Sequence, residues 1–400
     1  MLNLKSSLLL FALIGICAFP SSAQKLCGIS ELYERGMLDI NQRILPKAGS
    51  NKGLKSDQIY TIPTVIHVIF KNDTENISLA QIQSQLDVLN QDFRKLNADT
   101  TNLAPGFSKA DSKIVFCLAD RDPDGNKTDG INRIMTSIDN VCDLNSNQYF
   151  QLAPAWDSDK YLNIWVCDIN DDIAGFATFP GTASPQREGV VIDFSSFGTL
   201  GSAVFPYNKG RTTTHEIGHY FNLDHPWGKG DNNSNCTQDD GVADTPLQDG
   251  PAFGCPQDRS SCNSKDMLSN FMGFLNDACM GNFTEGQKDR MRNTLSGIRK
   301  SLIESNGCLF VGIEELKILE EIKLYPNPSK QFLKIDLPPS LQREKLQWQW
   351  FQANGQKLSI KTKTDFNGLT FNLKGYSAGI YFLQLLYEDE KITKKIMLQP

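Results

Sequence analysis

The stretch TTTHEIGHYFNLDHPWG, residues 212–228, contains His215, His219 and His225, although the whole chain has only 4 histidines. His215 and His219 are four positions apart, so on a helix they project from one face, one turn from each other. Glu216 lies about 100° further round the same helix, where its carboxylate reaches a water on an ion without binding the ion itself. The spacing therefore predicts a helix that offers two imidazoles to one metal ion, with a general base beside them.

His225 can become a third ligand only if this helix ends soon after His219 and the chain turns back. Asn222 suits that end, because Asn tolerates the left-handed backbone conformation better than any residue except Gly. Three neutral histidines leave one coordination position for water, which is typical of catalytic rather than structural zinc. The alternative is an ordinary helix with a salt-bridged glutamate, and it requires three of the 4 histidines to cluster by chance.

The number and distribution of charged residues argue against nucleic acid as a partner. Acidic and basic residues are interspersed along the 400-residue chain, and the formal net charge is -6. The sequence has no basic stripe of the kind that neutralises phosphates, so nucleic-acid binding is not expected.

The N-terminus has the parts of a secretory signal: Lys5, an apolar run over 8–19 and small residues up to Ala23. We therefore expect a signal peptide over 1–23. The apolar run is shorter than the roughly 20 residues that span a bilayer, and we identify no other transmembrane candidate. Export leads to an oxidising compartment, in which cysteines pair as disulfides.

The rest of the chain divides by pattern. Residues 24–58 end in a loop-like stretch and are predicted to be a pro-segment. Residues 59–310 mix helix and strand patterns, which predicts an α+β domain with long loops. Its expected elements are a buried strand over 59–70, a helix over 78–96 capped by Ser78, and strands over 113–120, 161–169 and 189–194. An acidic linker, 311–322, leads into 323–400, where short alternating strands predict a small β-sandwich.

Two motifs carry a family resemblance. HEIGHYFNLDH (215–225) resembles the HExxHxxGxxH zinc signature of the metzincin peptidases, with Asn222 where most members carry Gly. SNFMGFLNDACMGNFTEGQ (269–287) is similar to the methionine turn of the pappalysin and cytophagalysin family, which places the turn at Met272. The likeness extends to YLNIWVCDI (161–169) and GVADTP (241–246). It implies a metzincin-type zinc endopeptidase that acts on proteins or peptides.

The resemblance assigns roles. It makes the three histidines zinc ligands, Glu216 the general base and acid, and Met272 the residue beneath the metal; from the sequence alone, Met272 is only a polarizable core side chain. Relatives commonly have Tyr two positions after this methionine, where its hydroxyl can stabilise the tetrahedral intermediate, whereas this chain has Phe274. Asp277 matches the base of the pocket for the residue after the scissile bond, so Arg or Lys is expected there. The alternative for Asp277 is a solvated loop acid.

The acidic turn CTQDDGVADTP (236–246) is a cluster of hard oxygen ligands suited to Ca²⁺. By the resemblance, the calcium ligands are Asp240, the Val242 carbonyl and Thr245. The alternative is a solvated acidic turn without a bound ion.

The cysteines give a partial pairing. By the resemblance, Cys236 pairs with Cys262 and Cys255 with Cys279. The pairing of Cys117, Cys142, Cys167 and Cys308 stays open among three possibilities. Cys27 is left over in the pro-segment, where its thiolate can occupy the open zinc position and keep the precursor latent, as in cysteine-switch relatives. Pairing with another cysteine, or no role at all, is the alternative.

The C-terminal region has its own resemblance. LYPNPSKQFLKIDL (324–337) and the strands that follow resemble the C-terminal sorting domain read by the type IX secretion machinery of Bacteroidetes. A generic β-sandwich binding module is the alternative. The implied location is secreted or at the cell surface. A competing interpretation of the whole chain is a surface module or adhesin that keeps zinc and has lost turnover, which Phe274 makes conceivable.

Overall fold

The structure is a computed structural model. It describes residues 25–34, 43–45, 58–99, 107–146, 148–170, 172–229, 236–308, 322–337, 346–352, 355–365, 368–387 and 390–399. The expected signal peptide over 1–23 and the linker, apart from its last residue, lie outside these ranges. The chain divides into two compact units, Met1–Cys308 and Leu309–Pro400, and each is described by itself.

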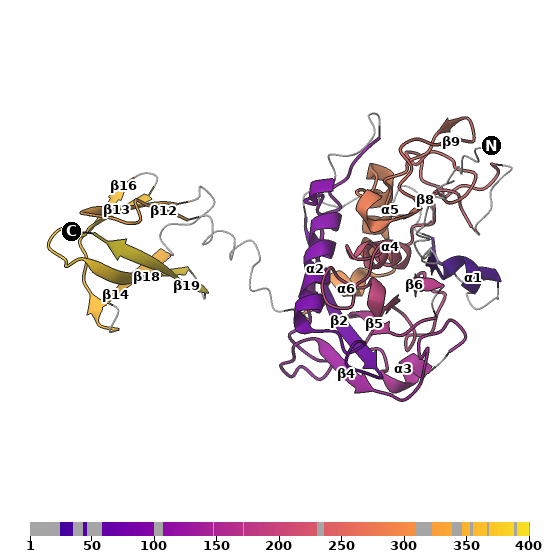
Figure 1. The fold of residues 1–400 in the computed structure, drawn as a ribbon, viewed down its shortest axis with the longest axis horizontal. Coiled ribbons are helices and arrows are strands. Elements are labelled where there is room, and N and C mark those ends of the chain that lie inside the picture. Colours follow the sequence, from indigo (N-terminus) through magenta and orange to yellow (C-terminus); the bar gives the residue numbers. More distant parts are fainter. Residues whose placement is uncertain are drawn as a thin grey trace, which may run out of the picture. The chain divides into compact units, whose positions relative to one another are not determined.

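A seven-stranded sheet is the centre of the N-terminal unit (Figure 1). Its strands pair in parallel, except that β6 runs antiparallel to β7. The predicted strands over 59–70, 113–120, 161–169 and 189–194 are confirmed. The order across the sheet is β1 (Leu26–Cys27), β6 (Ile173–Ala177), β7 (Val190–Asp193), β5 (Leu162–Cys167), β2 (Tyr60–Phe70) and β3 (Ile114–Leu118), with β4 (Ile131–Met135) also on β2.

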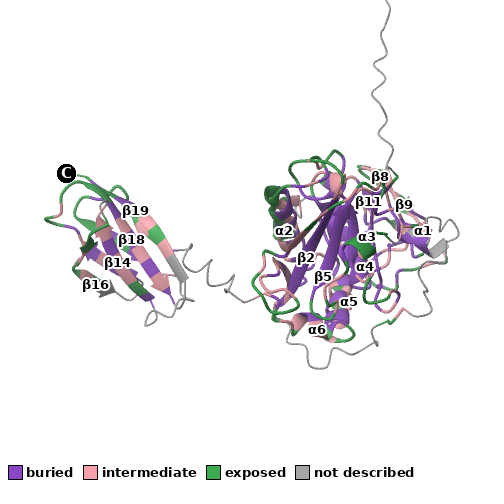
Figure 2. Cartoon of the chain, turned by 90° about the horizontal axis from the view of Figure 1, so that it is seen from below, coloured by how far each residue is buried: buried purple, intermediate pink, exposed green. Residues whose placement is uncertain are grey.

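Helices pack on this sheet and enclose the core. The predicted helix is α2 (Leu79–Phe93), and the Ser78 hydroxyl caps it by accepting the Gln81 amide at 3.1 Å. The histidine-bearing helix is α4 (Arg211–Tyr220), which contacts α2, β6 and β7. Figure 2 shows β2 and β5 buried along their length. The remaining elements of this unit are α1 (Ile29–Glu34), α3 (Gln148–Leu152), α5 (Glu285–Ser296), α6 (Lys300–Ile303), the 3₁₀ helices η3 (Phe194–Ser196) and η4 (Asp277–Cys279), and the short strands β8 (Phe253–Gly254), β9 (Ser260–Ser261), β10 (Ser264–Lys265) and β11 (Phe274–Leu275).

β6 was not among the strands expected from the sequence, although it contacts the histidine-bearing helix α4. Its sequence IAGFA contains small residues with weak strand preference. Gly175 explains the composition: a β-carbon there would lie 2.9 Å from the Val191 carbonyl oxygen and 3.1 Å from Cγ of Glu216. The helix and the strand can approach this closely only because residue 175 lacks a side chain.

Four disulfides tie the loops of this unit. Two are the pairs that the resemblance implies, Cys236–Cys262 and Cys255–Cys279. The open question about the other four cysteines is resolved, because Cys117 pairs with Cys308 and Cys142 with Cys167. Cys27 forms no disulfide with any described residue.

The C-terminal unit consists of two antiparallel four-stranded sheets. Residues of strand 332–336 are alternately exposed and buried, which places Leu333 and Ile335 in a core with Trp350, Phe371 and Leu383. One sheet has the order β12 (Lys323–Tyr325), β13 (Phe332–Asp336), β17 (Gly368–Asn372) and β16 (Thr362–Asp365), and the other β15 (Lys357–Leu358), β14 (Leu346–Gln352), β18 (Gly379–Tyr387) and β19 (Glu390–Leu398). Across the described part of the chain, no helix has the length and apolar character needed to cross a membrane.

Candidate metal centre and active site

The helix α4 ends as the sequence predicts. Asn222 has φ 78°, in the left-handed region, which confirms its expected role. The amide of Leu223 donates to the Gly218 carbonyl at 3.0 Å, and the amide of Asn222 donates to the His219 carbonyl at 2.8 Å. These two bonds form a Schellman turn, which reverses the chain directly after the helix. His225 is thereby brought back to face His215 and His219.

The three imidazoles converge through their Nε2 atoms. The Nε2–Nε2 distances are 3.0 Å for His215–His219, 3.1 Å for His219–His225 and 3.3 Å for His215–His225. Zinc–nitrogen bonds of about 2.0 Å in a tetrahedron place nitrogens about 3.3 Å apart, so the cluster fits a zinc ion. Nδ1 of His215 lies 2.7 Å from the Phe271 carbonyl oxygen and Nδ1 of His219 lies 2.8 Å from the Leu223 carbonyl oxygen. Both rings donate through Nδ1 and so leave Nε2 for a metal.

The charge state of the cluster suits metal binding. Burial lowers the pKa of His215 to about 4 and holds the pKa values of His219 and His225 well below their ordinary value. The rings are therefore neutral at physiological pH, as ligands must be. Cys27 completes the group: its sulfur lies 3.5 Å from Nε2 of His219, and the four potential ligand atoms lie within 4.8 Å of one another.

Glu216 lies beside the cluster as a buried carboxylate, 1% exposed. Among the described residues, neither carboxylate oxygen has a partner at full hydrogen-bond geometry, and the polar group that interacts with it is the Cys27 thiol. Burial raises the pKa of Glu216 to about 8, and the nearby Cys27 thiol acts in the opposite direction. A cation at the histidines would favour the ionised carboxylate. A buried carboxylate requires a polar partner, and a water could take this role only where the Cys27 sulfur no longer lies beside the histidines.

Met272 lies under the histidines and is fully buried. A β-carbon on Gly218 would come within 2.3 Å of its sulfur, so the methionine packs directly on α4 between His215 and His219. Phe274 packs edge-on against His225 with ring centroids 4.8 Å apart. The Phe274 ring therefore covers one side of the histidine cluster, and its side chain has no hydrogen-bond donor.

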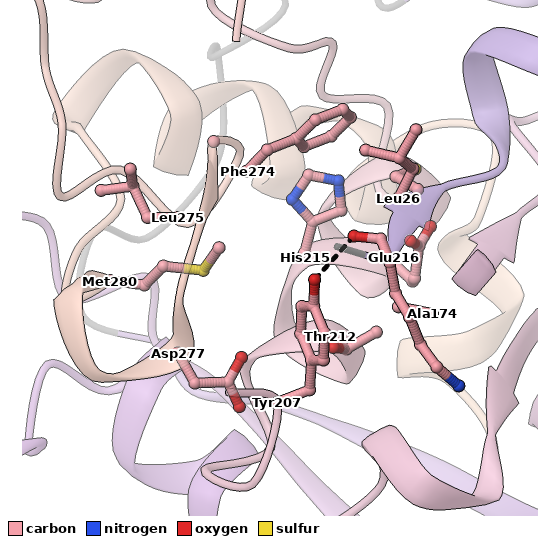
Figure 3. Close-up of a pocket in the computed structure, with 13 residues that line it drawn as sticks. Leu26, Ala174, Tyr207, Thr212, His215, Glu216, Phe274, Leu275, Asp277 and Met280 are labelled. Carbon is pink, nitrogen blue, oxygen red and sulfur yellow. Dashed lines mark hydrogen bonds between the residues drawn. The ribbon is translucent and has the colours of Figure 1, made fainter. Parts of the chain in front are cut away.

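A pocket extends from the histidine cluster towards Asp277 (Figure 3). The alternative of a solvated Asp277 is wrong, because this residue is 1% exposed. Its Oδ2 accepts the backbone amides of Lys209 at 2.8 Å and Arg211 at 3.2 Å, and burial raises its pKa to about 7. The lining residues are Lys25, Leu26, Cys27, Ala174, Tyr207, Thr212, His215, Glu216, Gly273, Phe274, Leu275, Asp277 and Met280.

Residues 25–27 line this pocket. Leu26 and Cys27 form β1, which pairs in parallel with β6 at Ile173 and Gly175. The Lys25 ammonium lies 2.8 Å from Oδ1 of Asp193, and the Lys25 carbonyl accepts the Tyr207 hydroxyl at 2.9 Å. Lys25, Leu26 and Cys27 therefore form part of the wall of the pocket beside the histidines.

The predicted calcium ligands also lie together. The Thr245 hydroxyl is 2.8 Å from each carboxylate oxygen of Asp240 and 2.6 Å from the Val242 carbonyl. Asp240 is buried, and burial raises its pKa to about 8. A carboxylate, a hydroxyl and a carbonyl oxygen thus lie in contact, and each is an oxygen type that calcium accepts as a ligand.

The sequence did not single out Tyr207, which lines the pocket, or Arg43, whose side chain contacts Asn222 and Asp224 at the end of α4. Tyr207 stands in VFPYNKG and Arg43 in NQRILP, and neither motif has a characteristic spacing. Only contacts between segments far apart in the chain identify them.

The histidine cluster, the buried glutamate and the underlying methionine, on a helix that packs against a mostly parallel sheet, define a metallopeptidase of the metzincin type. Comparison with known proteins specifies the family. Residues 145–296 match the sequence profile of the pregnancy-associated plasma protein-A peptidases, and residues 323–399 match the secretion system C-terminal sorting domain. The chain belongs to this pappalysin family of metalloendopeptidases and ends in a type IX sorting domain.

Individual relatives agree with this assignment. An extracellular metalloprotease of Arthroderma benhamiae is 31% identical over 241 residues, 58% of this chain and 71% of that protein. A second one from this fungus is 28% identical over 300 residues, 72% of this chain and 97% of that protein. Mature mirolysin of Tannerella forsythia, solved with a cleaved peptide, is 42% identical with TM-score 0.57, covering 61% of this chain and 96% of that chain. A promirolysin mutant is 38% identical with TM-score 0.58, covering 69% and 90%. The chain is thus a metalloendopeptidase with a secreted or cell-surface location.

Proposed function

We propose that this chain is the latent precursor of an exported zinc endopeptidase, in which His215, His219 and His225 hold the ion and Glu216 is the general base. The convergence of three Nε2 atoms beside a buried carboxylate carries the proposal. When bound, zinc lowers the pKa of an attacking water and polarises the scissile carbonyl. Glu216 takes a proton from this water and passes it to the nitrogen of the leaving amine.

Tyr207 helps to position the substrate in this scheme. Phe274 has no hydroxyl with which to stabilise a developing oxyanion. The Tyr207 hydroxyl already donates to a backbone carbonyl in the cleft, that of Lys25, at 2.9 Å. We infer that it holds a backbone carbonyl of the substrate in the same way. Asp277 gives the adjoining pocket a buried carboxylate, which supports a preference for Arg or Lys after the scissile bond.

Cys27 keeps the precursor latent in this proposal. A zinc–sulfur bond of about 2.3 Å and a zinc–nitrogen bond of about 2.0 Å place the two ligand atoms about 3.5 Å apart in a tetrahedron. Sγ of Cys27 and Nε2 of His219 are 3.5 Å apart. The thiolate would therefore fill the position that the attacking water requires, and release of the segment over 24–58 would open it. The promirolysin form of a relative supports a precursor stage.

The remaining proposals concern calcium and export. Asp240, Val242 and Thr245 bind a structural calcium ion beside the active site. The signal peptide over 1–23 directs the chain to the periplasm, and the type IX machinery reads residues 323–400 and carries the protein across the outer membrane.

The decisive experiment compares the full-length protein, activated by proteolysis within 46–57, with its Glu216→Gln variant. Zinc content is measured for both, together with hydrolysis of peptides containing Xaa-Arg and Xaa-Lys bonds. We expect one zinc in each protein and a loss of at least about 100-fold in kcat for the variant. Equal activity would exclude Glu216 as the base. Zinc without turnover in the activated parent would favour the surface-binding alternative.

A further inference from the structure

A second part of the pro-segment, residues 43–45, lies against the turn that ends α4. The Arg43 guanidinium donates to Oδ1 of Asn222 at 2.6 Å, to the Asn222 carbonyl at 2.9 Å and to Oδ1 of Asp224 at 2.7 Å. It also lies over the Phe179 ring, 3.9 Å from the centroid. Only 3% of the Arg43 side chain is exposed. Phe179, Asn222 and Asp224, which we call the guanidinium site, thus surround one charged group almost completely.

The guanidinium site adjoins the metal cluster. The Phe179 ring packs edge-on against His219 with centroids 5.4 Å apart. The backbone of the pro-segment is also held there, because the Ile44 amide donates to the Pro180 carbonyl at 3.0 Å and the Asn222 side-chain amide donates to the Ile44 carbonyl at 2.9 Å. An extended peptide held by main-chain bonds, with a side chain in a pocket, is a recurring mode of peptide recognition.

Contacts with β6 and the residues that follow it, up to Pro180, show where the guanidinium site lies relative to the pocket. Leu26, which lines the Asp277 pocket, pairs with Ile173, and Cys27 at the metal cluster pairs with Gly175. The Ile44 amide donates to the carbonyl of Pro180, which lies five positions after Gly175 in the chain. The guanidinium site therefore lies across the metal cluster from the Asp277 pocket, and none of its three residues lines that pocket. If Asp277 receives the residue after the scissile bond, the guanidinium site faces residues before it.

The chemistry of the site selects arginine. A guanidinium is planar, donates in several fixed directions and stacks on an aromatic ring, whereas an ammonium is a compact charge that can do only part of this. Another cation, Arg290, interacts electrostatically with Asp224, but its guanidinium donates to the backbone carbonyls of Asp240 and Gly241. Asp224 is thus left to pair with a guanidinium that comes from the cleft.

These contacts explain why residue 222 is Asn and not Gly. The turn needs a left-handed residue, and Gly adopts that conformation with less strain. Asn supplies the turn and, in addition, an amide whose oxygen and nitrogen both contact the pro-segment. A glycine at position 222 would keep the turn but would lose the side-chain hydrogen bonds to Arg43 and Ile44.

We propose that Phe179, Asn222 and Asp224 form an arginine subsite for peptide substrates, on the side before the scissile bond, which Arg43 occupies until the pro-segment is removed. The proposal deepens the peptidase function and depends on it for turnover, although binding at the subsite does not. Substrates are then peptides with arginine on this side of the bond, independently of any preference set by Asp277.

Binding is tested in the full-length Arg43→Ala variant, whose guanidinium site lacks its own arginine. The probe is the labelled peptide Asn-Gln-Arg-Ile-Leu-Pro, which copies residues 41–46, and the controls replace its arginine by Lys or Gln. We expect the arginine peptide to bind about tenfold more tightly than the Gln peptide, with the Lys peptide between them. Asn222→Gly or Asp224→Asn in this background should remove most of that difference. Equal affinity for the arginine and Gln peptides in a folded Arg43→Ala protein, judged by its thermal unfolding, overturns the proposal.

Cleavage is tested with the activated full-length enzyme on matched peptides that carry Arg or Gln before the scissile bond. The ratio of their kcat/KM values should favour Arg about tenfold and approach one in Asp224→Asn. A ratio near one in the parent overturns the proposal even if both peptides are cleaved well. If the activated parent cleaves no peptide, the peptidase function fails, and the binding experiment still decides the subsite.

Discussion

Gly218 and Met272 are in direct contact beneath the metal cluster, because a β-carbon on Gly218 would lie 2.3 Å from the Met272 sulfur and 3.2 Å from its terminal methyl carbon. The glycine lies between His215 and His219 in HEIGH. It allows the methionine turn to press against α4, and Asn270 holds that turn by accepting the Met272 amide at 2.9 Å. The absence of a side chain at residue 218 therefore determines how closely Met272 can approach the helix that carries His215 and His219.

Gly218→Ala should consequently destabilise the protein. Alanine normally favours a helix over glycine, but here its methyl group would displace a fully buried side chain. We expect the free energy of unfolding to fall by about 1–3 kcal/mol and zinc retention to weaken. Urea denaturation and metal content measure the two effects. Adding Met272→Val, which shortens the opposing side chain, should restore part of the stability; a Gly218→Ala protein as stable as the parent would refute the packing argument.

Local patterns explain why so much of this site was predictable. Helical spacing placed His215 and His219 on one face, and the tolerance of Asn222 for left-handed backbone predicted the turn that returns His225. The alternation of Leu333 and Ile335 similarly predicted a half-buried strand in the C-terminal unit. These features depend on residues within a few positions of each other, and the structure contains each of them.

Release of latency is a separate prediction. Cys27→Ser removes the thiolate from the metal cluster while keeping a side chain of similar size. We expect the uncleaved variant to hydrolyse peptides that the uncleaved parent leaves intact, because water can then reach the ion. Cys27→Asp is the matched control, since a carboxylate can still bind zinc and should preserve much of the latency. An uncleaved Cys27→Ser protein as inactive as the parent would show that another contact blocks the cleft.

Asp277 should make the preference for basic residues depend on pH. Burial raises its pKa to about 7, so the carboxylate is charged above this pH and neutral below it. The ratio of kcat/KM for Xaa-Arg over Xaa-Gln peptides should therefore rise, by about tenfold, as the pH increases from 6 to 8. Asp277→Asn keeps an oxygen for the amides of Lys209 and Arg211 and should give a low, flat ratio. A flat ratio in the parent would exclude Asp277 as the charge that selects the substrate.

Other parts of the site were beyond the sequence because distant segments create them. The strand β6 is poor in strand-forming residues since Gly175 must admit Glu216. Tyr207 becomes part of the site through its bond to Lys25, and Arg43 through its bonds to Asn222 and Asp224. The pairing of Cys117 with Cys308 joins residues 191 positions apart. No local period or spacing encodes such contacts, which exist only once the sheet has brought the segments together.

The calcium proposal can be tested without any measurement of activity. Asp240 is 3% exposed and shares its carboxylate with the Thr245 hydroxyl, so a bound cation would offset the cost of a buried charge. At calcium concentrations about 100 times Kd, binding to the folded state should add about 2.7 kcal/mol to the free energy of unfolding, compared with EGTA. Asp240→Asn should abolish this difference, whereas Asp258→Asn, an exposed pair partner of Lys265, should keep it. Unfolding curves that coincide in calcium and EGTA for the parent would mean that the acidic turn binds no calcium.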